Sequence, residues 1–305
     1  MTSILLTGKD GQVGFELRRA LAPLGKLVAP ERGELDLADG GSIRSWVREA
    51  RPAVIVNAGA YTAVDRAESE PELARAVNAT APGILAEEAR RLGAVLVHYS
   101  TDYVFDGKKA GPYREEDPPA PLSQYGRSKL EGEQAIAAAG CPHLILRTSW
   151  VYGARGANFL LTMLRLARER EELRIVDDQV GAPTWSRDIA QATAAILAKI
   201  SGLSSGDAAE WSGVYHLTAA GQTSWYGFAQ AIFREAGALI PRIPRLIPVG
   251  TADYPLPARR PRNSVLSCAK VQARFGVARP AWQEALSQVM RELRNQGGSD
   301  RTGQD

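Results

Sequence analysis

Short apolar runs alternate with longer, more polar stretches through the first half of the chain. Each run covers only a few residues, which suits a strand that is buried on both faces of a sheet. The stretches between the runs have the pattern of helices. This alternation predicts an α/β fold with a doubly wound parallel sheet and right-handed crossovers. The predicted strands are residues 4–6, 27–29, 54–57, 94–99 and 144–147, and the predicted helices are residues 15–24, 72–79, 82–92 and 125–138.

The second half of the chain is less regular. A stretch rich in proline and arginine at 255–263 interrupts its predicted elements. We expect a first domain at 1–147 and a smaller, discontinuous second domain at 148–296, with segments near 175–215 returning to pack on the first. The polar, glycine-rich end at 297–305 is predicted to be a disordered tail. The predicted helices here are residues 159–170, 186–199, 225–236 and 282–293, and the predicted strand is 214–217.

A glycine-rich turn joins the first predicted strand to the first predicted helix. Its glycines follow the spacing G-x-x-G-x-x-G, whereas the commoner G-x-G-x-x-G is absent. Glycines at such a turn let the backbone approach a pyrophosphate, which then sits on the helix N-terminus. The position between strand and helix predicts a Rossmann-like, dinucleotide-binding first domain. The candidate cofactor-binding residues of this turn are Gly8, Asp10, Gly11, Gln12, Val13 and Gly14.

Further cofactor contacts are expected after the next strands. An acidic residue after the second strand usually holds the ribose 2′-hydroxyl of NADH, and an arginine there usually accepts the 2′-phosphate of NADPH. Glu31 and Arg32 stand side by side, so the sequence leaves both NADPH and NADH open. Asp36 and Leu37 are placed to flank the adenine. Small residues after a strand leave room for a cofactor that crosses the sheet edge, and Ala58, Gly59 and Ala60 fit that need.

Thr101, Tyr125 and Lys129 carry the candidate chemistry. Tyr125 and Lys129 are four residues apart and share one face of a predicted helix. A neighbouring ammonium lowers the pKa of a phenol, which can then protonate an oxygen that develops negative charge. Thr101 can donate a second hydrogen bond to that oxygen. The other interpretation of the pair alone is an exposed helical Tyr/Lys contact without catalytic meaning.

Composition narrows the class of protein. The 305 residues are 45% hydrophobic and 23% charged, as in ordinary globular enzymes. A net charge of +3 without a basic run gives nucleic-acid binding little support. Cys141 and Cys268 fit no disulfide or metal framework, and the three histidines His98, His143 and His216 are expected to be packed residues. Without a signal peptide or an apolar run long enough for a bilayer, we expect a cytoplasmic protein that does not enter membranes.

Five strings of residues together resemble the extended short-chain dehydrogenase/reductases, and within them the dTDP-4-dehydrorhamnose reductases. The strings are residues 8–14, 62–68, 100–107, 147–153 and 178–184. This resemblance implies reduction of the C4 ketone of dTDP-4-dehydro-β-L-rhamnose to dTDP-L-rhamnose, with NADPH or NADH as cofactor. It assigns catalysis to Thr101, Tyr125 and Lys129, with Tyr125 and Lys129 also near the cofactor.

The resemblance also implies contacts outside the catalytic trio. Thr62 joins the cofactor-binding residues, and Lys129 can hold the nicotinamide ribose. For Trp150 the alternative is a buried structural residue, and for Arg260 and Asn263 it is a solvated basic loop. The implied residues for binding the nucleotide-sugar substrate are Val64, Asp102, Tyr103, Trp150, Arg260 and Asn263.

Departures from sister families narrow the expected reaction. Nucleotide-sugar 4,6-dehydratases carry a glutamate where this chain has Tyr103, so the base for eliminating water is missing. Epimerases usually carry asparagine where this chain has Trp150. Two open alternatives remain: a reductase of a different nucleotide 4-ketosugar, or a non-catalytic dinucleotide-binding subunit similar to the regulatory β subunit of methionine adenosyltransferase.

One further departure concerns metal binding. Some reductases of the resembled family dimerise around a magnesium ion held by glutamates. Two of these glutamates match Glu16 and Glu292, but the third position is Arg187. A hard cation requires carboxylate oxygens, whereas a guanidinium can pair directly with the glutamates. We therefore expect no metal, and a monomer or a metal-independent homodimer.

Overall fold

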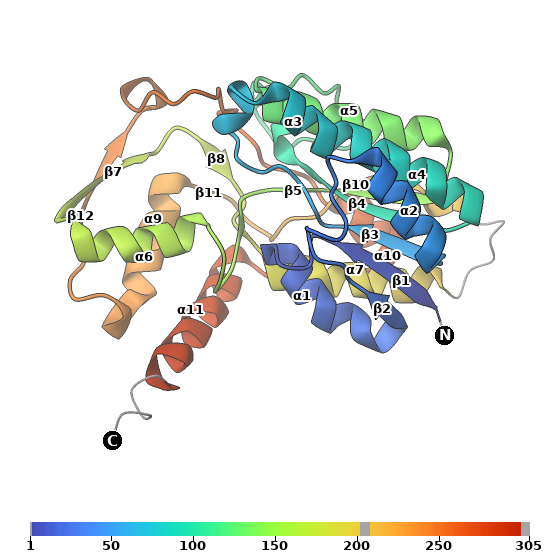
Figure 1. The fold of residues 1–305 in the computed structure, drawn as a ribbon. Coiled ribbons are helices and arrows are strands. Elements are labelled where there is room, and N and C mark those ends of the chain that lie inside the picture. The colour runs from blue at the N-terminus through green and yellow to red at the C-terminus, as the bar shows by residue number, and fades with distance from the viewer. Residues whose placement is uncertain (1, 202–207, 300–305) are drawn as a thin grey trace.

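The computed structural model describes residues 2–201 and 208–299. A six-stranded parallel sheet with helices on both faces forms the larger part, and a smaller lobe lies beside it (Figure 1). The strand order is β10-β5-β4-β3-β1-β2, so the doubly wound parallel sheet is confirmed. The strands are β1 (Ser3–Thr7), β2 (Lys26–Val28), β3 (Val54–Asn57), β4 (Val95–Thr101), β5 (His143–Thr148) and β10 (Gly213–His216).

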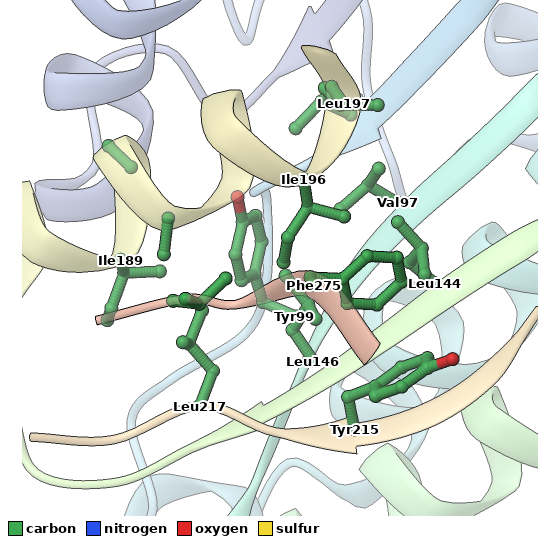
Figure 2. Packing of buried hydrophobic residues seen from close by; sticks show 14 of the residues in the cluster. Val97, Tyr99, Leu144, Leu146, Ile189, Ile196, Leu197, Tyr215, Leu217 and Phe275 are labelled. Carbon is green, nitrogen blue, oxygen red and sulfur yellow. The ribbon is translucent and has the colours of Figure 1, made fainter. Parts of the chain in front are cut away.

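Apolar runs form these strands because helices cover both faces of the sheet. Side chains alternate between the faces of a strand, so Ile4 and Leu6 join one core while Leu5 joins the other. Figure 2 shows the first core, where Ile196 and Phe275 pack over the sheet. On that face lie α1 (Gln12–Leu21), α7 (Ser186–Ile200) and α10 (Ala269–Phe275). On the other lie α2 (Gly40–Ala50), α4 (Ala81–Leu92) and α5 (Gln124–Ala139).

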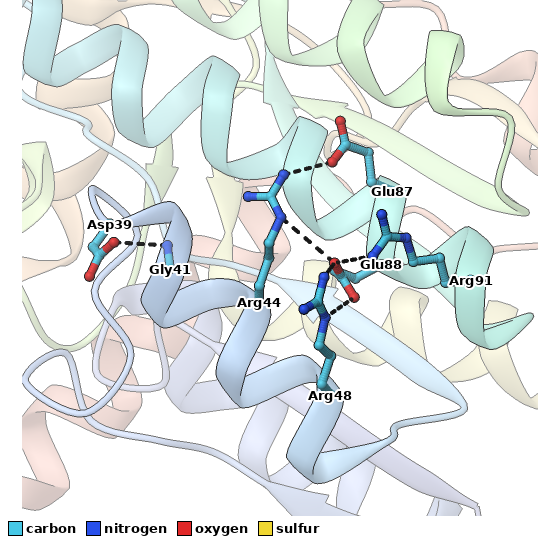
Figure 3. A network of polar contacts seen from close by, with 7 residues as sticks. All are labelled: Asp39, Gly41, Arg44, Arg48, Glu87, Glu88 and Arg91. Carbon is cyan, nitrogen blue, oxygen red and sulfur yellow. Dashed lines mark hydrogen bonds and ion pairs between the residues drawn. The ribbon is translucent and has the colours of Figure 1, made fainter.

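An ion-pair cluster joins α2 to α4 on the second face (Figure 3). Glu88 is almost fully buried and receives two hydrogen bonds from Arg48, at 2.7 and 3.0 Å. Arg44 and Arg91 lie within 3.8 and 3.4 Å of the same carboxylate. The buried charge is therefore compensated by three guanidinium groups.

The structure corrects the predicted gap between two helices in the segment before β4. Helix α3 (Pro71–Arg75) continues through a π-helical turn (Ala76–Thr80) directly into α4. Pro82 has no backbone N–H and cannot complete a regular helical ladder, which accounts for the widened turn before it. The widened turn positions Asn78, whose side chain accepts from Tyr61 N at 2.9 Å and donates to Tyr61 O at 2.9 Å. It therefore fixes the loop that follows β3.

The smaller lobe has its own hydrophobic core. Helices α6, α9 and α11 surround it together with the parallel pair β7–β12. Two short pairs, β6–β9 and β8–β11, lie where the lobe meets the sheet. The helices are α6 (Phe159–Glu169), α9 (Trp225–Ala236) and α11 (Trp282–Ser299), whereas α8 (Ala208–Trp211) precedes β10 and packs into the first core of the sheet. The strands are β6 (Val151–Tyr152), β7 (Glu172–Val176), β8 (Val180–Gly181), β9 (Thr184–Trp185), β11 (Thr223–Ser224) and β12 (Arg245–Val249).

Segments from the second half return to the sheet. Helix α7 packs on the same face as α1, β10 pairs with β5, and α10 packs on that face as well. Helix α11 continues to Ser299, so the expected tail is wrong for 297–299, because extending an existing helix costs less than starting one. Residues 300–305 of that tail lie outside the described residues. None of the helices described here is both long and apolar enough to cross a membrane.

Candidate active site

The candidate site residues converge on one edge of the sheet. Parallel strands place their carboxyl ends together, so the glycine turn after β1 lies beside the loop after β3 and the end of β4. The chain leaves β1 toward β2 on one side and returns to β3 on the other. Such a switch point is where open α/β sheets bind ligands.

The glycine turn has the geometry required for a pyrophosphate. Gly8 has φ +68°, and a Cβ there would lie 2.4 Å from Gly59 N. A Cβ on Gly14 would lie 1.9 Å from Gly8 O. Helix α1 begins after Gly11 without a side-chain cap, so its first N–H groups point to an open position. The predicted turn residues therefore fit a dinucleotide.

The segment after β2 places charges of both signs at the cofactor edge. Lys9 Nζ pairs with Glu31 Oε1 at 3.0 Å, a contact that the sequence did not reveal. Arg32 is exposed. Asp36 is exposed and accepts a hydrogen bond from Ala38 N. Leu37 reaches toward Gly59, because a Cβ added to Gly59 would lie 2.4 Å from Leu37 Cδ1.

The other predicted cofactor-binding residues differ in their exposure. Ala58 and Ala60 are half-buried, Val13 packs at the edge of the core, and Asp10 and Thr62 are exposed.

A loop of the smaller lobe lies against the start of α1. Gln12 accepts a hydrogen bond from Asn158 Nδ2 at 3.0 Å and donates to Ala157 O at 3.4 Å. The guanidinium of Arg155 lies 3.6 Å from the ring centroid of Phe15. The loop therefore borders the position where the pyrophosphate would bind.

The start of α5 brings Tyr125 to Thr101. Ser123 caps the helix by accepting from Gly126 N at 3.2 Å. A Cβ on Gly126 would lie 2.3 Å from Tyr103 O, so the helix approaches the turn after β4 more closely than other residues allow. This close approach brings the Tyr125 phenol near enough to the Thr101 hydroxyl for the hydroxyl to lower the pKa of the phenol.

The pKa of Tyr125 differs from the expectation. Burial raises it to about 12, the Thr101 hydroxyl opposes the rise, and the nearby charge of Asp102 adds to it. Lys129 is not among the groups that shift it, so the expected lowering by the ammonium is not found. The phenol consequently keeps its proton at neutral pH.

Lys129 is buried, about one helical turn after Tyr125 on α5. Its Nζ donates to Tyr99 O at 2.5 Å and lies 3.0 Å from His98 Nε2. Desolvation lowers the pKa of Lys129 to about 7, against the opposing charge of Glu133. The Glu133 carboxylate is itself bound by Arg147, at 2.6 and 2.9 Å, and by Ser100.

Asp102 is a buried carboxyl group beside the catalytic threonine. Thr101 donates to its Oδ1 at 3.0 Å. Burial raises the pKa of Asp102 to about 7, and the hydrogen bond from Thr101 limits the rise. This group therefore changes charge near neutral pH.

Trp150 and Trp225 form a stacked pair of indole rings, which we call the aromatic wall. Their rings stack with centroids 3.6 Å apart and planes 5° apart. Trp150 has φ +47°, which is strained for a bulky residue. A Cβ on Gly181 would lie 2.5 Å from the Trp150 ring, so the indole is held between Gly181 and Trp225. Trp225 was not predicted, because nothing near it in the sequence resembled a binding motif.

The two C-terminal candidates are already engaged with protein groups. Arg260 forms a bidentate pair with Asp65 at 2.8 and 3.1 Å and also hydrogen-bonds Tyr103. Asn263 Nδ2 donates to the carbonyls of Lys109 and Gly111, at 2.8 and 2.9 Å. The segment that carries both residues nevertheless reaches the site, because Asn263 forms a parallel β-bridge with Val180 of β8. Val64 lies half-buried next to Asp65.

Arg187 occupies the position between the two matched glutamates. It contacts Glu16 at 2.9 and 3.2 Å and Glu292 at 2.8 Å. The predicted direct pairing is therefore confirmed, and Arg187 bonds to both carboxylates. Within residues 2–201 and 208–299, no group of three or more His, Cys, Asp or Glu side chains is placed to hold a metal ion.

A glycine turn on a switch-point sheet, a threonine/tyrosine pair and a buried lysine define an oxidoreductase of the extended short-chain dehydrogenase/reductase class. Residues 1–295 match the family model described as RmlD substrate binding domain. The chain is 52% identical to a dTDP-4-dehydrorhamnose reductase from Burkholderia thailandensis, over 96% of this chain and 99% of that protein.

Solved structures with a similar fold carry the same name as this relative. A dTDP-4-dehydrorhamnose reductase from Clostridium acetobutylicum is 36% identical with a TM-score of 0.86, covering 96% of this chain and 100% of that one. The enzyme from Bacillus anthracis in complex with NADP is 35% identical with a TM-score of 0.85 and the same coverage. The chain belongs to the RmlD substrate-binding-domain family.

Proposed function

We propose that this chain catalyses the NAD(P)H-dependent reduction of the C4 ketone of dTDP-4-dehydro-β-L-rhamnose to dTDP-L-rhamnose. The observation that carries the proposal is the placement of Thr101, Tyr125 and the buried Lys129 at one edge of the sheet, one strand away from the glycine turn. The relative from Burkholderia thailandensis, 52% identical over 99% of its own length, supports the same reaction.

Each part of the proposed reaction is assigned to particular residues. NAD(P)H, when bound, would supply a hydride to the carbonyl carbon. The glycine turn at 8–14 and the α1 N-terminus hold the pyrophosphate, and Glu31 and Arg32 face the adenine ribose. Thr101 donates a hydrogen bond to the carbonyl oxygen. The Tyr125 O–H bond breaks as its proton passes to that oxygen, which completes the alcohol.

The raised pKa of Tyr125 suits this direction of reaction. A donor must hold its proton until charge develops on the substrate oxygen, and an alkoxide is far more basic than a phenolate. Lys129 then stabilises the phenolate and holds the nicotinamide ribose. The raised pKa of Tyr125 thus supports it as the acid, whereas the role of Lys129 rests on its place four residues along the same helix.

For the substrate we propose the aromatic wall and the Arg260 region. Trp150 packs against the sugar, and Asp102 and Tyr103 contact it beside Thr101. Arg260 neutralises one charge of the diphosphate while Asp65 fixes its side chain. Val64 and Asn263 shape the pocket by holding the loops around it. We propose a matching division into domains at residue 147. The residues before it mainly bind the cofactor, and the residues after it mainly bind the substrate.

A substrate panel tests the proposal. Purified protein is incubated with several nucleotide 4-ketosugars and with each reduced cofactor, and oxidation of the cofactor is followed with product analysis. Turnover of the dTDP-linked 4-keto-L-sugar above the others is expected. Absence of turnover with every ketosugar would favour the non-catalytic subunit instead. Incubation with dTDP-glucose and NAD serves as control and should give no 4-keto-6-deoxy product, because Tyr103 stands where elimination needs a carboxylate.

A further inference from the structure

A chain of buried polar groups connects the cofactor side of the sheet to Lys129. Gly59 N donates to Thr7 Oγ1 at 3.3 Å, and Thr7 Oγ1 donates to Asn57 Oδ1 at 2.6 Å. Asn57 Nδ2 lies 3.0 Å from His98 Nδ1, and His98 Nε2 lies 3.0 Å from Lys129 Nζ. The four side chains are between 1% and 3% exposed. Three neighbouring strands and one helix therefore share a continuous hydrogen-bond path.

His98 is the side chain that contacts Lys129 Nζ. No carboxylate forms an ion pair with Lys129 among the residues that the structure describes. Glu133 lies one helical turn away, but Arg147 and Ser100 bind its oxygens. The polar contacts of Nζ are therefore the ring of His98 and one backbone carbonyl.

We propose that His98 is a positioning residue, which holds Lys129 Nζ through its Nε2 and ties it, through Asn57 and Thr7, to the backbone that borders the cofactor. The inference rests on the proposed function, because it gives His98 a part in the reaction of Tyr125 and Lys129.

A histidine suits this position because Lys129, with a pKa of about 7, exists both with and without its proton near neutral pH. A lysine ammonium only donates hydrogen bonds, whereas a neutral amine can accept one. With the Asn57 amide as it stands, Asn57 donates to Nδ1, and the ring proton lies on Nε2, directed at the amine. With the amide turned over, Nδ1 carries the proton and Nε2 accepts from the ammonium. One imidazole thus serves both charge states, which a hydrocarbon side chain cannot do.

Burial, against the opposing charge of Glu133, brings the pKa of Lys129 close to neutrality. His98 faces it from β4, Glu133 faces it from its own helix with Arg147 of β5 behind, and Tyr125 lies one turn before it beside Asp102. Burial and the charge of Lys129 lower the pKa of His98 well below its ordinary value. The ring therefore stays neutral while Lys129, with a pKa of about 7, changes charge.

Nuclear magnetic resonance of the histidine rings tests the contact independently of substrate. The chain has three histidines, so ¹⁵N-labelled histidine gives few signals, and His98→Gln identifies those of His98. The His98 ring should stay neutral between about pH 5.5 and 8.5, although a free imidazole titrates near 6.5. Its nitrogen shifts should follow one transition that disappears in Lys129→Met. Ordinary protonation of His98, or unchanged shifts in Lys129→Met, would overturn the proposal.

Kinetics test the consequence for the reaction. His98→Phe fills the space without a hydrogen bond, His98→Gln retains an amide donor and acceptor, and His216→Phe removes another fully buried imidazole as matched control. His98→Phe should lower kcat about tenfold or more and move its alkaline limb down by about one pH unit, because the ammonium loses an acceptor. His98→Gln should recover most of kcat, and His216→Phe should keep the pH profile.

The outcomes separate the two proposals. A folded His98→Phe protein with the wild-type kcat and pH profile, or one that loses only thermal stability, would refute the positioning role. If the wild-type protein reduces no 4-ketosugar while the His98 signals still respond to Lys129→Met, the contact stands and the proposed function fails.

Discussion

At the scale of a residue, burial sets the protonation state of Tyr125. Its pKa is raised to about 12, so nearly every molecule carries the proton at neutral pH. The nearby Thr101 hydroxyl offsets part of the rise in the Tyr125 pKa. The residue is thus prepared to give a proton to a group more basic than itself.

We predict that Tyr125→Phe lowers the rate of reduction by about 10²- to 10⁴-fold, the usual effect of losing a general acid. Cofactor affinity should change little, because the ring still packs edge-on against Tyr103. Steady-state turnover measures the first effect and cofactor fluorescence titration the second. Undiminished turnover would show that another group supplies the proton.

A second residue-scale prediction concerns cofactor choice. Glu31 disfavours a 2′-phosphate, although its pairing with Lys9 weakens this, while exposed Arg32 attracts one. We expect both NADH and NADPH to be used, with less than about a tenfold difference in kcat/KM, which corresponds to about 1.4 kcal/mol. Glu31→Gln should shift the ratio toward NADPH, and Arg32→Gln toward NADH. A hundredfold preference in the wild-type protein would contradict this.

At the scale of elements, the Glu88 cluster decides how firmly α2 packs on α4. Glu88 is 2% exposed, whereas the neighbouring Glu87, which pairs with Arg44, is 53% exposed. Removing a buried charge leaves its partners uncompensated, while exposed pairs contribute little. The two adjacent glutamates therefore form a matched comparison.

We predict that Glu88→Gln lowers the free energy of unfolding by about 1–3 kcal/mol and Glu87→Gln by less than about 0.5 kcal/mol. Folding lowers the pKa of Glu88, chiefly through its hydrogen bonds with Arg48. Its stabilisation is thus complete above the unfolded value of about 4.3 and is lost as pH falls through the folded pKa. Urea unfolding at several pH values should show the Glu88→Gln difference shrinking below about pH 4.3; a constant difference would contradict this.

At the scale of the whole molecule, Arg187 joins the two lobes. It extends from α7 to Glu16 on α1 of the sheet and to Glu292 on α11 of the smaller lobe. The Glu16 side chain is only 8% exposed, so it depends on this partner. A guanidinium between two carboxylates also occupies the place where a cation would need a third carboxylate.

We predict that chelator changes neither activity nor oligomeric state, and that the protein is a monomer or a metal-independent homodimer. Arg187→Met should lower the free energy of unfolding by about 1–3 kcal/mol, because it leaves a buried carboxylate unpaired. Arg291→Met, in the same surface cavity but on an exposed arginine, is the control. Analytical sedimentation with magnesium and with chelator provides the measurement. A dimer that dissociates on chelation would contradict the prediction.

The sequence by itself determined the features that depend on near neighbours. The apolar runs at 4–6 and 54–57 predicted buried strands, since both faces of the sheet demand apolar residues. The glycine turn was predictable because only glycine tolerates φ +68° at Gly8 against the backbone of Gly59. Tyr125 and Lys129 were recognisable because their spacing places them on one helical face.

Only the tertiary structure decided the contacts that join distant segments. His98 was expected to be a packed residue, yet it bridges Asn57 and Lys129, which lie 41 and 31 positions away. Arg260 meets Asp65 across 195 positions. Helical and strand periodicity act over a few residues, whereas the strand order brings remote polar groups into one buried space. There each group must find a partner, because an unpaired polar group away from water costs about 1–3 kcal/mol.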